Sequence, residues 1–219
     1  SILVVGAPDN DSDAALESGS AYAFRTTDDG ASWTFVQKLV AVDAEEYGRF
    51  GYSLSVSGSN LVVGAPGVTT TASVFRTNDD GGSWTFVQKL VADGASRFGN
   101  SVSISGSILV VGAPDNDSDA ALESGSAYAF RTTDDGASWT FVQKLVAVDA
   151  EEYGRFGYSL SVSGSNLVVG APGVTTTASV FRTNDDGGSW TFVQKLVADG
   201  ASRFGNSVSI SGSILVVGA

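Results

Sequence analysis

Residues 50–66 read FGYSLSVSGSNLVVGAP, and this stretch decides the fold. Larger side chains alternate with serine from Tyr52 to Ser57, which is the period-two pattern of a half-buried β-strand. The run Leu61–Val63 is apolar throughout, as expected for a strand covered on both faces. A Gly-Ser-Asn turn joins the two strands, and Pro66 ends the second one, where a missing N–H is tolerated. The stretch therefore predicts a β-hairpin that packs against other sheets.

The same stretch recurs along the chain. Its Phe-Gly pair begins at residues 50, 98, 156 and 204, with spacings of 48, 58 and 48 residues. Residues 1–106 recur without a change as 107–212, and residues 213–219 begin a third copy. Such identity indicates recent duplication, homogenisation or design. Spacings near ~50 residues are typical of propeller blades, so we predict one repeat array over residues 1–219, built from two-blade units.

Two further strands are expected in each sub-repeat. They cover residues 72–76 and 84–90 in the short sub-repeat, and residues 21–25 and 33–39 in the long one. The serines between residues 53 and 57 are small enough to let a neighbouring blade approach closely. Each sub-repeat is therefore predicted to form a four-stranded antiparallel blade.

The series of Phe-Gly and Gly-Ala-Pro motifs resembles the FG-GAP repeat of integrin-type β-propellers and of many extracellular microbial repeat proteins. The resemblance covers essentially the whole chain. It implies an all-β fold, a β-propeller of four-stranded antiparallel blades with four blades per chain. It also implies an extracellular or cell-surface location.

Closure of the ring is predicted from the order of the strands. Residues 204–212 are expected to supply the inner strand of the blade that residues 1–40 begin. A ring of four blades from one chain needs about 90° between neighbouring blades, and a ring of eight blades from two chains needs about 45°. The family usually has seven blades, with about 51° between neighbours. The eight-blade ring of two chains is closer to this angle and is therefore favoured. Because residues 213–219 duplicate residues 1–7, part of a longer array or filament is a third alternative.

Composition excludes several functions. The chain has no Cys and no His, so thiolate metal sites and histidine general bases are excluded. Its net charge of −12 argues against nucleic acids and anionic membrane surfaces, and its apolar runs are too short to span a bilayer. We expect no nucleic-acid partner and no membrane insertion, whereas cations or a basic partner suit the acidic surface.

Residues 26–33 (TTDDGASW) and 77–84 (TNDDGGSW) resemble the Asp-box hairpin, S-x-D-x-G-x-T-W. In this turn the Asp carboxylate accepts hydrogen bonds from backbone N–H groups, glycine supplies a positive φ, and tryptophan covers the hairpin. Asp boxes occur in sialidases, where the box is structural and lies away from the active site. The resemblance therefore predicts a structural turn, and we expect no catalytic residues and no enzyme.

Residues 9–13 (DNDSD) look like a D-x-D-x-D calcium loop, in which several oxygens lie within about 2.3–2.6 Å of one ion. Ala14 stands after Asp13 where an EF-type loop has glycine. The calcium loop of integrin blades corresponds here to residues 58–60, which lack a carboxylate, so that site is not carried over. A solvated loop is the alternative, and Ca²⁺ is the one cofactor considered. The candidate ligands are Asp9, Asp11, Asp13 and Glu17 in the first copy and Asp115, Asp117, Asp119 and Glu123 in the second.

The same loops contain N-x-S sequons at Asn10 and Asn116, the candidate glycosylation sites.

Arg49 and Arg97, just before Phe-Gly pairs, are predicted to bridge carboxylates or carbonyls between blades. Tyr47 and Tyr52 are interpreted as packing residues rather than as platforms for a substrate.

The most favoured function is a non-enzymatic structural or adhesive extracellular scaffold that mediates assembly or protein binding. Its expected partners are further copies of the chain, an extracellular protein or a glycan. An engineered symmetric propeller is a variant of this reading. The alternative is a carbohydrate-binding or sialidase-like propeller.

Overall fold

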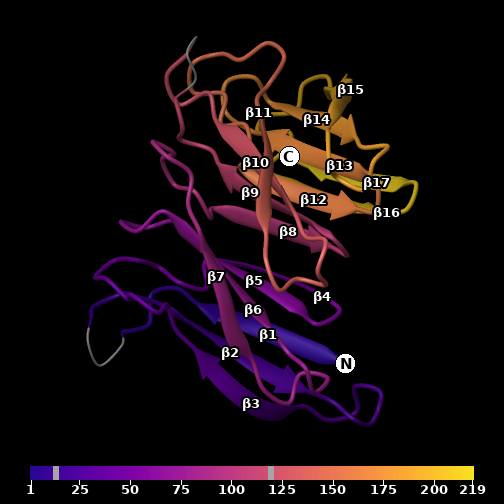
Figure 1. Cartoon of the computed structure of the whole chain (residues 1–219). Helices are drawn as coiled ribbons and strands as arrows, with labels where there is room; N and C mark the ends of the chain where they lie inside the picture. Colours follow the sequence, from indigo (N-terminus) through magenta and orange to yellow (C-terminus); the bar gives the residue numbers. More distant parts are fainter. Residues whose placement is uncertain (12–14, 118–120) are drawn as a thin grey trace.

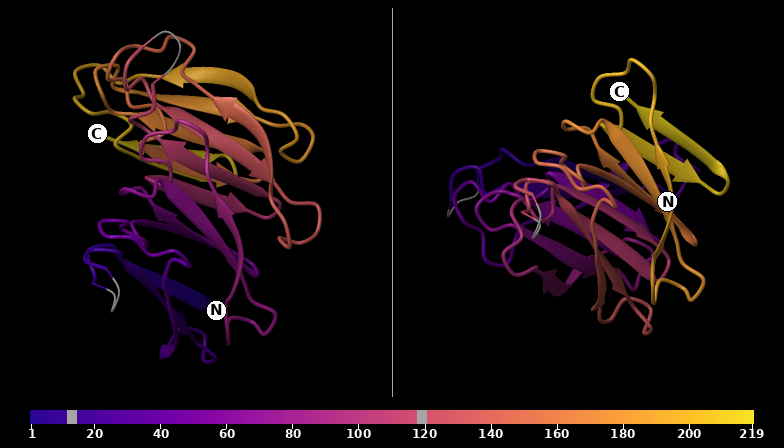
Figure 2. Two further views of the ribbon diagram at one scale, coloured as in Figure 1. Left: turned by 60° about the vertical axis from the view of Figure 1, so that its left-hand side comes forward. Right: turned by 90° about the horizontal axis from the view of Figure 1, so that it is seen from above.

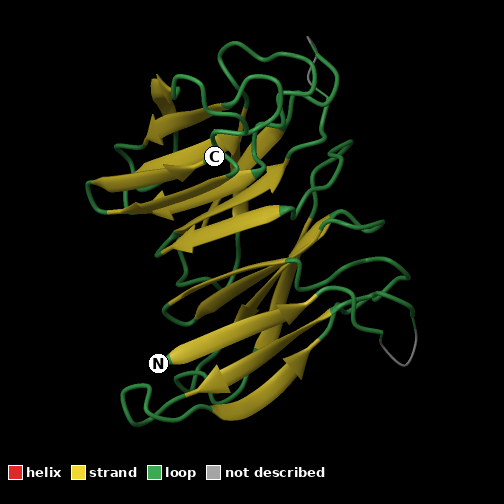
Figure 3. Ribbon diagram, turned by 180° about the vertical axis from the view of Figure 1, so that it is seen from behind, coloured by secondary structure: helices red, strands yellow, loops and turns green. Residues whose placement is uncertain are grey.

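The structure is a computed structural model that describes residues 1–11, 15–117 and 121–219. These residues form seventeen β-strands in antiparallel sheets joined by turns and loops (Figures 1 and 3). No helix in this described part of the chain has the length and apolar character needed to cross a membrane. The predicted all-β class is therefore confirmed.

Three complete four-stranded sheets lie between two partial ones. The first sheet contains β1 (Ile2–Ala7), β2 (Ser20–Arg25) and β3 (Thr34–Leu39). The complete sheets are β4 (Ser53–Ser57), β5 (Asn60–Ala65), β6 (Thr71–Arg76) and β7 (Thr85–Leu90); β8 (Ser101–Ser105), β9 (Ile108–Ala113), β10 (Ser126–Arg131) and β11 (Thr140–Leu145); and β12 (Ser159–Ser163), β13 (Asn166–Ala171), β14 (Thr177–Arg182) and β15 (Thr191–Leu196). The last sheet pairs β16 (Ser207–Ser211) with β17 (Ile214–Gly218).

Each complete sheet has the strand order that the sequence predicts. In the second sheet the order is β4-β5-β6-β7, with Ser53 opposite Gly64 and Ser57 opposite Asn60 in the first hairpin. Leu61, Val62 and Val63 of β5 are fully buried, as expected for a strand covered on both faces. The sheets follow one another along the chain as blades, from the indigo end to the yellow end of Figure 2.

The core lies between successive sheets. One cluster joins Val62 and Val74 of the second sheet to Leu109, Val111 and other residues of the third. Equivalent clusters lie between the first and second sheets and between the third and fourth. Each core cluster is therefore shared by two successive blades, because a single sheet cannot cover its own faces.

Serine side chains connect the innermost strands of neighbouring blades. The Ser53 hydroxyl donates to the Gly99 carbonyl at 2.8 Å, and Ser55 Oγ accepts the N–H of Ile104 at 3.1 Å. The third and fourth blades repeat these contacts through Ser101 and other serines. The predicted role of the serines, close approach of blades, is confirmed, and the structure adds specific hydrogen bonds.

The two motif glycines meet across each blade junction. A Cβ built on Gly64, from Gly-Ala-Pro, would lie 2.0 Å from the carbonyl oxygen of Gly99, from the next Phe-Gly pair. Gly112 has the same relation to Gly157, also at 2.0 Å. No side chain fits between these backbones. The spacing of the two motifs is therefore explained by one backbone contact that every junction needs.

A glutamine of the outermost strand in each of the first three sheets binds the next blade. The Gln88 side-chain amide donates to the Trp139 carbonyl at 3.0 Å, and its oxygen accepts the Trp139 N–H at 2.9 Å. Gln37 and Gln143 make the same pair of bonds to the backbone of Trp84 and Trp190, respectively. This two-bond contact, named here the Gln–Trp clasp, was not foreseen from the sequence.

Within this single chain the ring does not close. The inner strand β16, which was expected to complete the first sheet, pairs with β17 of its own hairpin, and β1 remains an edge strand. Figure 1 shows β1 and β17 in separate parts of the molecule. The reason is that residues 214–218 have the same sequence as residues 2–6 and adjoin β16 in the chain, so the local hairpin occupies the position.

Candidate functional site

In each acidic loop, at residues 8–11 and 15–19 and at residues 114–117 and 121–125, a hydrogen bond joins the two described parts. Asp11 Oδ1 accepts the backbone N–H of Glu17 at 2.9 Å, and Asp117 does the same for Glu123 at 2.9 Å. The Glu17 carboxylate lies 3.9 Å from the Arg49 guanidinium. These two aspartates therefore organise their own loop.

Arginines bridge these loops to the adjoining connections, as predicted. Arg49 Nε lies 3.5 Å from Asp9, whose side chain is 71% exposed. In the second copy, Arg97 and Arg155 lie 3.3 and 3.8 Å from Asp115, whose side chain is only 20% exposed. Arg97 lies in the connection between β7 and β8, and among the described residues no second arginine lies beside Asp9. The same residue therefore has one cationic neighbour in the first copy and two in the second.

The calcium prediction remains a prediction. Asp13 and Asp119, two of the expected ligands, lie outside the described residues. Among the residues that are described, no group of three or more acidic side chains is placed to hold a metal ion. Of the remaining candidates, the carboxylates of Asp9, Asp11, Glu17, Asp115 and Asp117 contact arginine or backbone N–H groups.

The two sequon asparagines point into the structure. Asn10 Nδ2 donates to Ser20 Oγ at 3.2 Å. Asn116 is buried, and its Nδ2 donates to Ser126 Oγ at 3.0 Å and to the Tyr128 hydroxyl at 3.4 Å. An N-linked glycan is attached at this nitrogen. The predicted glycan therefore requires the side chain to leave these hydrogen bonds.

On the opposite side of the blades, the turn at residues 132–139 has the hydrogen bonds that the sequence predicts. Asp134 Oδ1 accepts the hydroxyl of Thr132 at 2.7 Å and the backbone N–H of Ser138 at 2.9 Å. The N–H of Gly136 donates to Thr132 Oγ1 at 2.9 Å. The turns centred on Asp28, Asp79 and Asp185 repeat these bonds.

These hydrogen bonds lower the pKa of the turn aspartates. Donation by Ser138 and Thr132 lowers the pKa of Asp134 from 3.8 to about 2, and the pKa values of Asp28 and Asp79 are also about 2. The pKa of Asp185 is lowered by its bonds from Thr183 and Ser189. The ionised form is favoured because it accepts several hydrogen bonds at once.

The lowered pKa values predict a loss of stability in acid. The pKa of an aspartate in the unfolded chain is about 3.9, and above this pH the lowered folded-state pKa stabilises the fold in full. This contribution is lost as the pH falls through the folded-state pKa of about 2. We expect urea unfolding to show a decline between these pH values that is shallower in Asp134→Asn. Asp135→Asn removes a neighbouring charge and is the control. Equal acid sensitivity of Asp134→Asn and the wild type would contradict the prediction.

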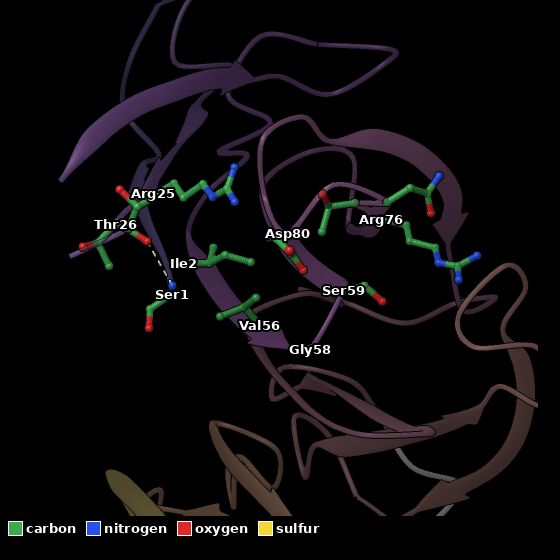
Figure 4. Close-up of a pocket in the computed structure, with 12 residues that line it drawn as sticks. Ser1, Ile2, Arg25, Thr26, Val56, Gly58, Ser59, Arg76 and Asp80 are labelled. Atoms are coloured by element: carbon green, nitrogen blue, oxygen red, sulfur yellow. Dashed lines mark hydrogen bonds between the residues drawn. The ribbon is translucent and has the colours of Figure 1, made fainter. Parts of the chain in front are cut away.

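Two grooves lie between successive blades beside these turns. The first, of about 930 Å³, lies between the first two sheets and is lined by Arg25, Arg76 and Asp80 among others. Figure 4 shows the two arginines on opposite sides of Asp80. The second, of about 680 Å³, lies at the next junction and is lined by Arg76, Arg131 and Asp135. We name them the arginine grooves.

The arginines of these grooves are half-buried, and no ion pair of theirs is found among the described residues. The Nε atoms of Arg76 and Arg131 are buried without a hydrogen-bond partner in that part of the chain. These residues were not predicted. The available signal was an arginine that ends the third strand of every sub-repeat, at residues 25, 76, 131 and 182.

A third groove, of about 650 Å³, lies on the side of the acidic loops, between the fourth blade and the connection that leads to β16. Tyr153, Tyr158, Arg155 and Arg203 are among its lining residues. Tyr47, which occupies the position of Tyr153 in the first copy, is 49% exposed. This exposure exceeds what the predicted packing role requires. We name this hollow the tyrosine groove.

Repeated four-stranded antiparallel sheets, packed blade on blade, are the architecture of β-propeller proteins. The FG-GAP repeat family model matches residues 33–83, 84–130, 139–189 and 190–219, and the chain belongs to this family. No curated protein matches the chain. Among solved structures, the crystal structure of Saccharomyces cerevisiae Sqt1 is similar over 69% of this chain and 36% of that chain, with 14% identity and a TM-score of 0.46.

Proposed function

We propose that this chain is a non-enzymatic scaffold that binds protein segments in its arginine grooves. The observation that carries the proposal is repetition of the groove. Arg76 lines both the first and the second groove, because each blade contributes one wall to the junction before it and one to the junction after it. Equivalent sites at regular intervals suit multivalent binding, in which each weak contact raises the effective concentration of the next.

The groove chemistry favours an extended polar segment as the ligand. A guanidinium group offers several N–H donors in a fixed plane, which matches carboxylate and carbonyl oxygens. The buried Nε atoms of Arg76 and Arg131 have no acceptor among the described residues, so a ligand oxygen there would satisfy a donor that folding has already desolvated. Asp80 and Asp135 beside them supply acceptors for N–H groups of the same segment.

Peptide selection tests this proposal. A random peptide library is selected on the immobilised 219-residue chain, and the affinity of selected peptides is measured by calorimetry. We expect Arg76→Gln to weaken binding about 10- to 100-fold, the range for losing a hydrogen bond to a charged group. Arg49→Gln, on the opposite side of the blades, is the matched control. If no peptides are selected, or if both variants bind equally well, the proposal is wrong.

An extracellular or cell-surface location and a role in adhesion are part of the proposal. Their support is the resemblance to extracellular repeat proteins. Labelling of producing cells with a membrane-impermeant reagent is expected to modify the lysines of this protein, and exclusive protection of those lysines would contradict the location.

Carbohydrate binding is the second candidate function, and the tyrosine groove favours it. Tyrosine offers a flat apolar face with a polar hydroxyl, and arginine offers planar donors, a combination suited to a polar ring. A glycan array is expected to identify a ligand whose binding is lost in Tyr153→Ala and retained in Tyr22→Ala. An array without a ligand would remove this candidate, whereas turnover of a fluorogenic sialoside would overturn the non-enzymatic assignment.

A further inference from the structure

The first sheet exposes an apolar face that is buried inside the chain. Leu3 and Val5 of β1 are 42% and 47% exposed. Leu109 and Val111, the same residues one repeat later, are both 0% exposed because the second sheet covers them. Residues 1–106 and 107–212 are identical, so the face on β1 has the same side chains as a face that the chain already packs.

The fourth blade exposes the complementary face. Val87 of β7 packs against the core between the second and third sheets. Val193, its equivalent in β15, is 56% exposed, because the last sheet has only the two inner strands β16 and β17 to cover the blade before it. The outer half of this face, formed by β14 and β15, is therefore open.

The Gln–Trp clasp is divided between the two ends. Gln88 clasps Trp139, which is 3% exposed. One repeat later the glutamine is Gln194, which is exposed, and no partner for it is found among the described residues. The matching tryptophan is Trp33, which is 41% exposed. Each end thus holds one half of a contact that inside the chain is complete.

We propose that the fourth blade of one chain docks onto the first sheet of a second copy of this chain. In the contact, β16 of one copy and β1, β2 and β3 of the other form one complete four-stranded blade. The internal hairpin β8–β9 sets the register, in which Ser101 lies opposite Gly112. Ser207 is accordingly placed opposite Gly6 of the second copy, and Gln194 clasps its Trp33.

Strand β17 has to leave for this contact to form. The β16–β17 hydrogen-bond ladder is replaced by a ladder between β16 and β1 of the second copy. The two ladders are equivalent, because residues 214–218 and residues 2–6 have the same sequence, ILVVG. What the second copy adds is β2 and β3, which cover the open half of the fourth blade and bury Val193 and Trp33. The driving force is therefore the removal of this apolar surface from water. The interface joins different surfaces of the two copies, so it is head to tail.

Sedimentation velocity over a range of concentrations tests the contact. The wild-type 219-residue chain is expected to exceed the mass of one copy as concentration rises. Val5→Asp blocks one end and Val193→Asp blocks the other, so each variant alone is expected to remain a single copy. In an equimolar mixture, the intact fourth blade of Val5→Asp can dock onto the intact first sheet of Val193→Asp. The mixture is therefore expected to form complexes of two copies that do not grow further. Val148→Asp, at a loop residue that is 69% exposed, is the control and is expected to associate like the wild type.

Several results would overturn the inference. They are a wild-type chain that stays single at every concentration, association of either end variant alone, and a mixture that forms no pairs. Gln194→Leu provides a second variant at an exposed side chain and is expected to weaken association without changing the unfolding curve of the single copy. Because these end faces lie outside the arginine grooves, the contact goes beyond the proposed function, and peptide binding by the single-copy variants shows separately whether that function holds.

Discussion

We expect Gly112→Ala to lower the free energy of unfolding by about 3 kcal/mol, the upper part of the usual range for overpacking. The new Cβ would lie 2.0 Å from the carbonyl oxygen of Gly157 in the next blade. That oxygen belongs to backbone and accepts the hydroxyl of Ser101, so neither group moves without opening the junction. Urea unfolding of the variant and the wild type measures the difference.

The repeat supplies a matched control for this substitution. Gly218 follows the same residues, ILVV, but no following blade contacts it. The three atoms nearest to a Cβ there all belong to Ser207, the closest being the Oγ at 2.3 Å. Because a hydroxyl can rotate away, we expect Gly218→Ala to change the free energy of unfolding by less than about 1 kcal/mol. Equal effects of the two substitutions would show that the junction contact is not the cause.

We expect Phe98→Ala to lower the free energy of unfolding by about 3–5 kcal/mol. The Phe98 side chain is fully buried and belongs to the core between the second and third sheets. Its ring packs edge-on against Tyr128 and Phe130, with centroid distances of 5.4 and 6.3 Å. Truncation leaves a cavity that two sheets border, and neither can collapse into it without losing its own ladder.

Phe204 is the matched control for Phe98. It lies in the same sequence, SRFGNS, but is only partly buried, because the last sheet has two strands instead of four. We expect Phe204→Ala to cost clearly less than Phe98→Ala in the same urea titration. If both truncations cost the same, the loss would come from the Phe-Gly turn itself and not from the core.

Local patterns predicted the strands within two or three residues. The alternation from Tyr52 to Ser57 identified β4, and the apolar run Leu61–Val63 identified β5 as a covered strand. The turns centred on aspartate were also predictable, because all their hydrogen bonds join residues within four positions of one another. The Gln–Trp clasp was not predictable in this way, because its partners lie 47 or 51 residues apart.

The candidate sites were predicted less completely, because a groove needs two blades. The acidic loop is one segment, so its residues could be named from the sequence. The arginine grooves combine Arg25 with Arg76, and Arg76 with Arg131, from different sheets. Each arginine by itself resembled any exposed strand end, and only the packing of neighbouring blades revealed its role as a groove residue.

The exact repeat separates what each level of structure determined. Sequence by itself determined the strands, the turns and the face to which each side chain belongs, since these depend on neighbours along the chain and are the same in both copies. Tertiary structure decided burial, ion pairing and closure. Leu3 is exposed where Leu109 is buried, and Asp9 has one arginine neighbour where Asp115 has two. Identical residues differ here because the free energy of burial depends on which blades lie beside them in the structure.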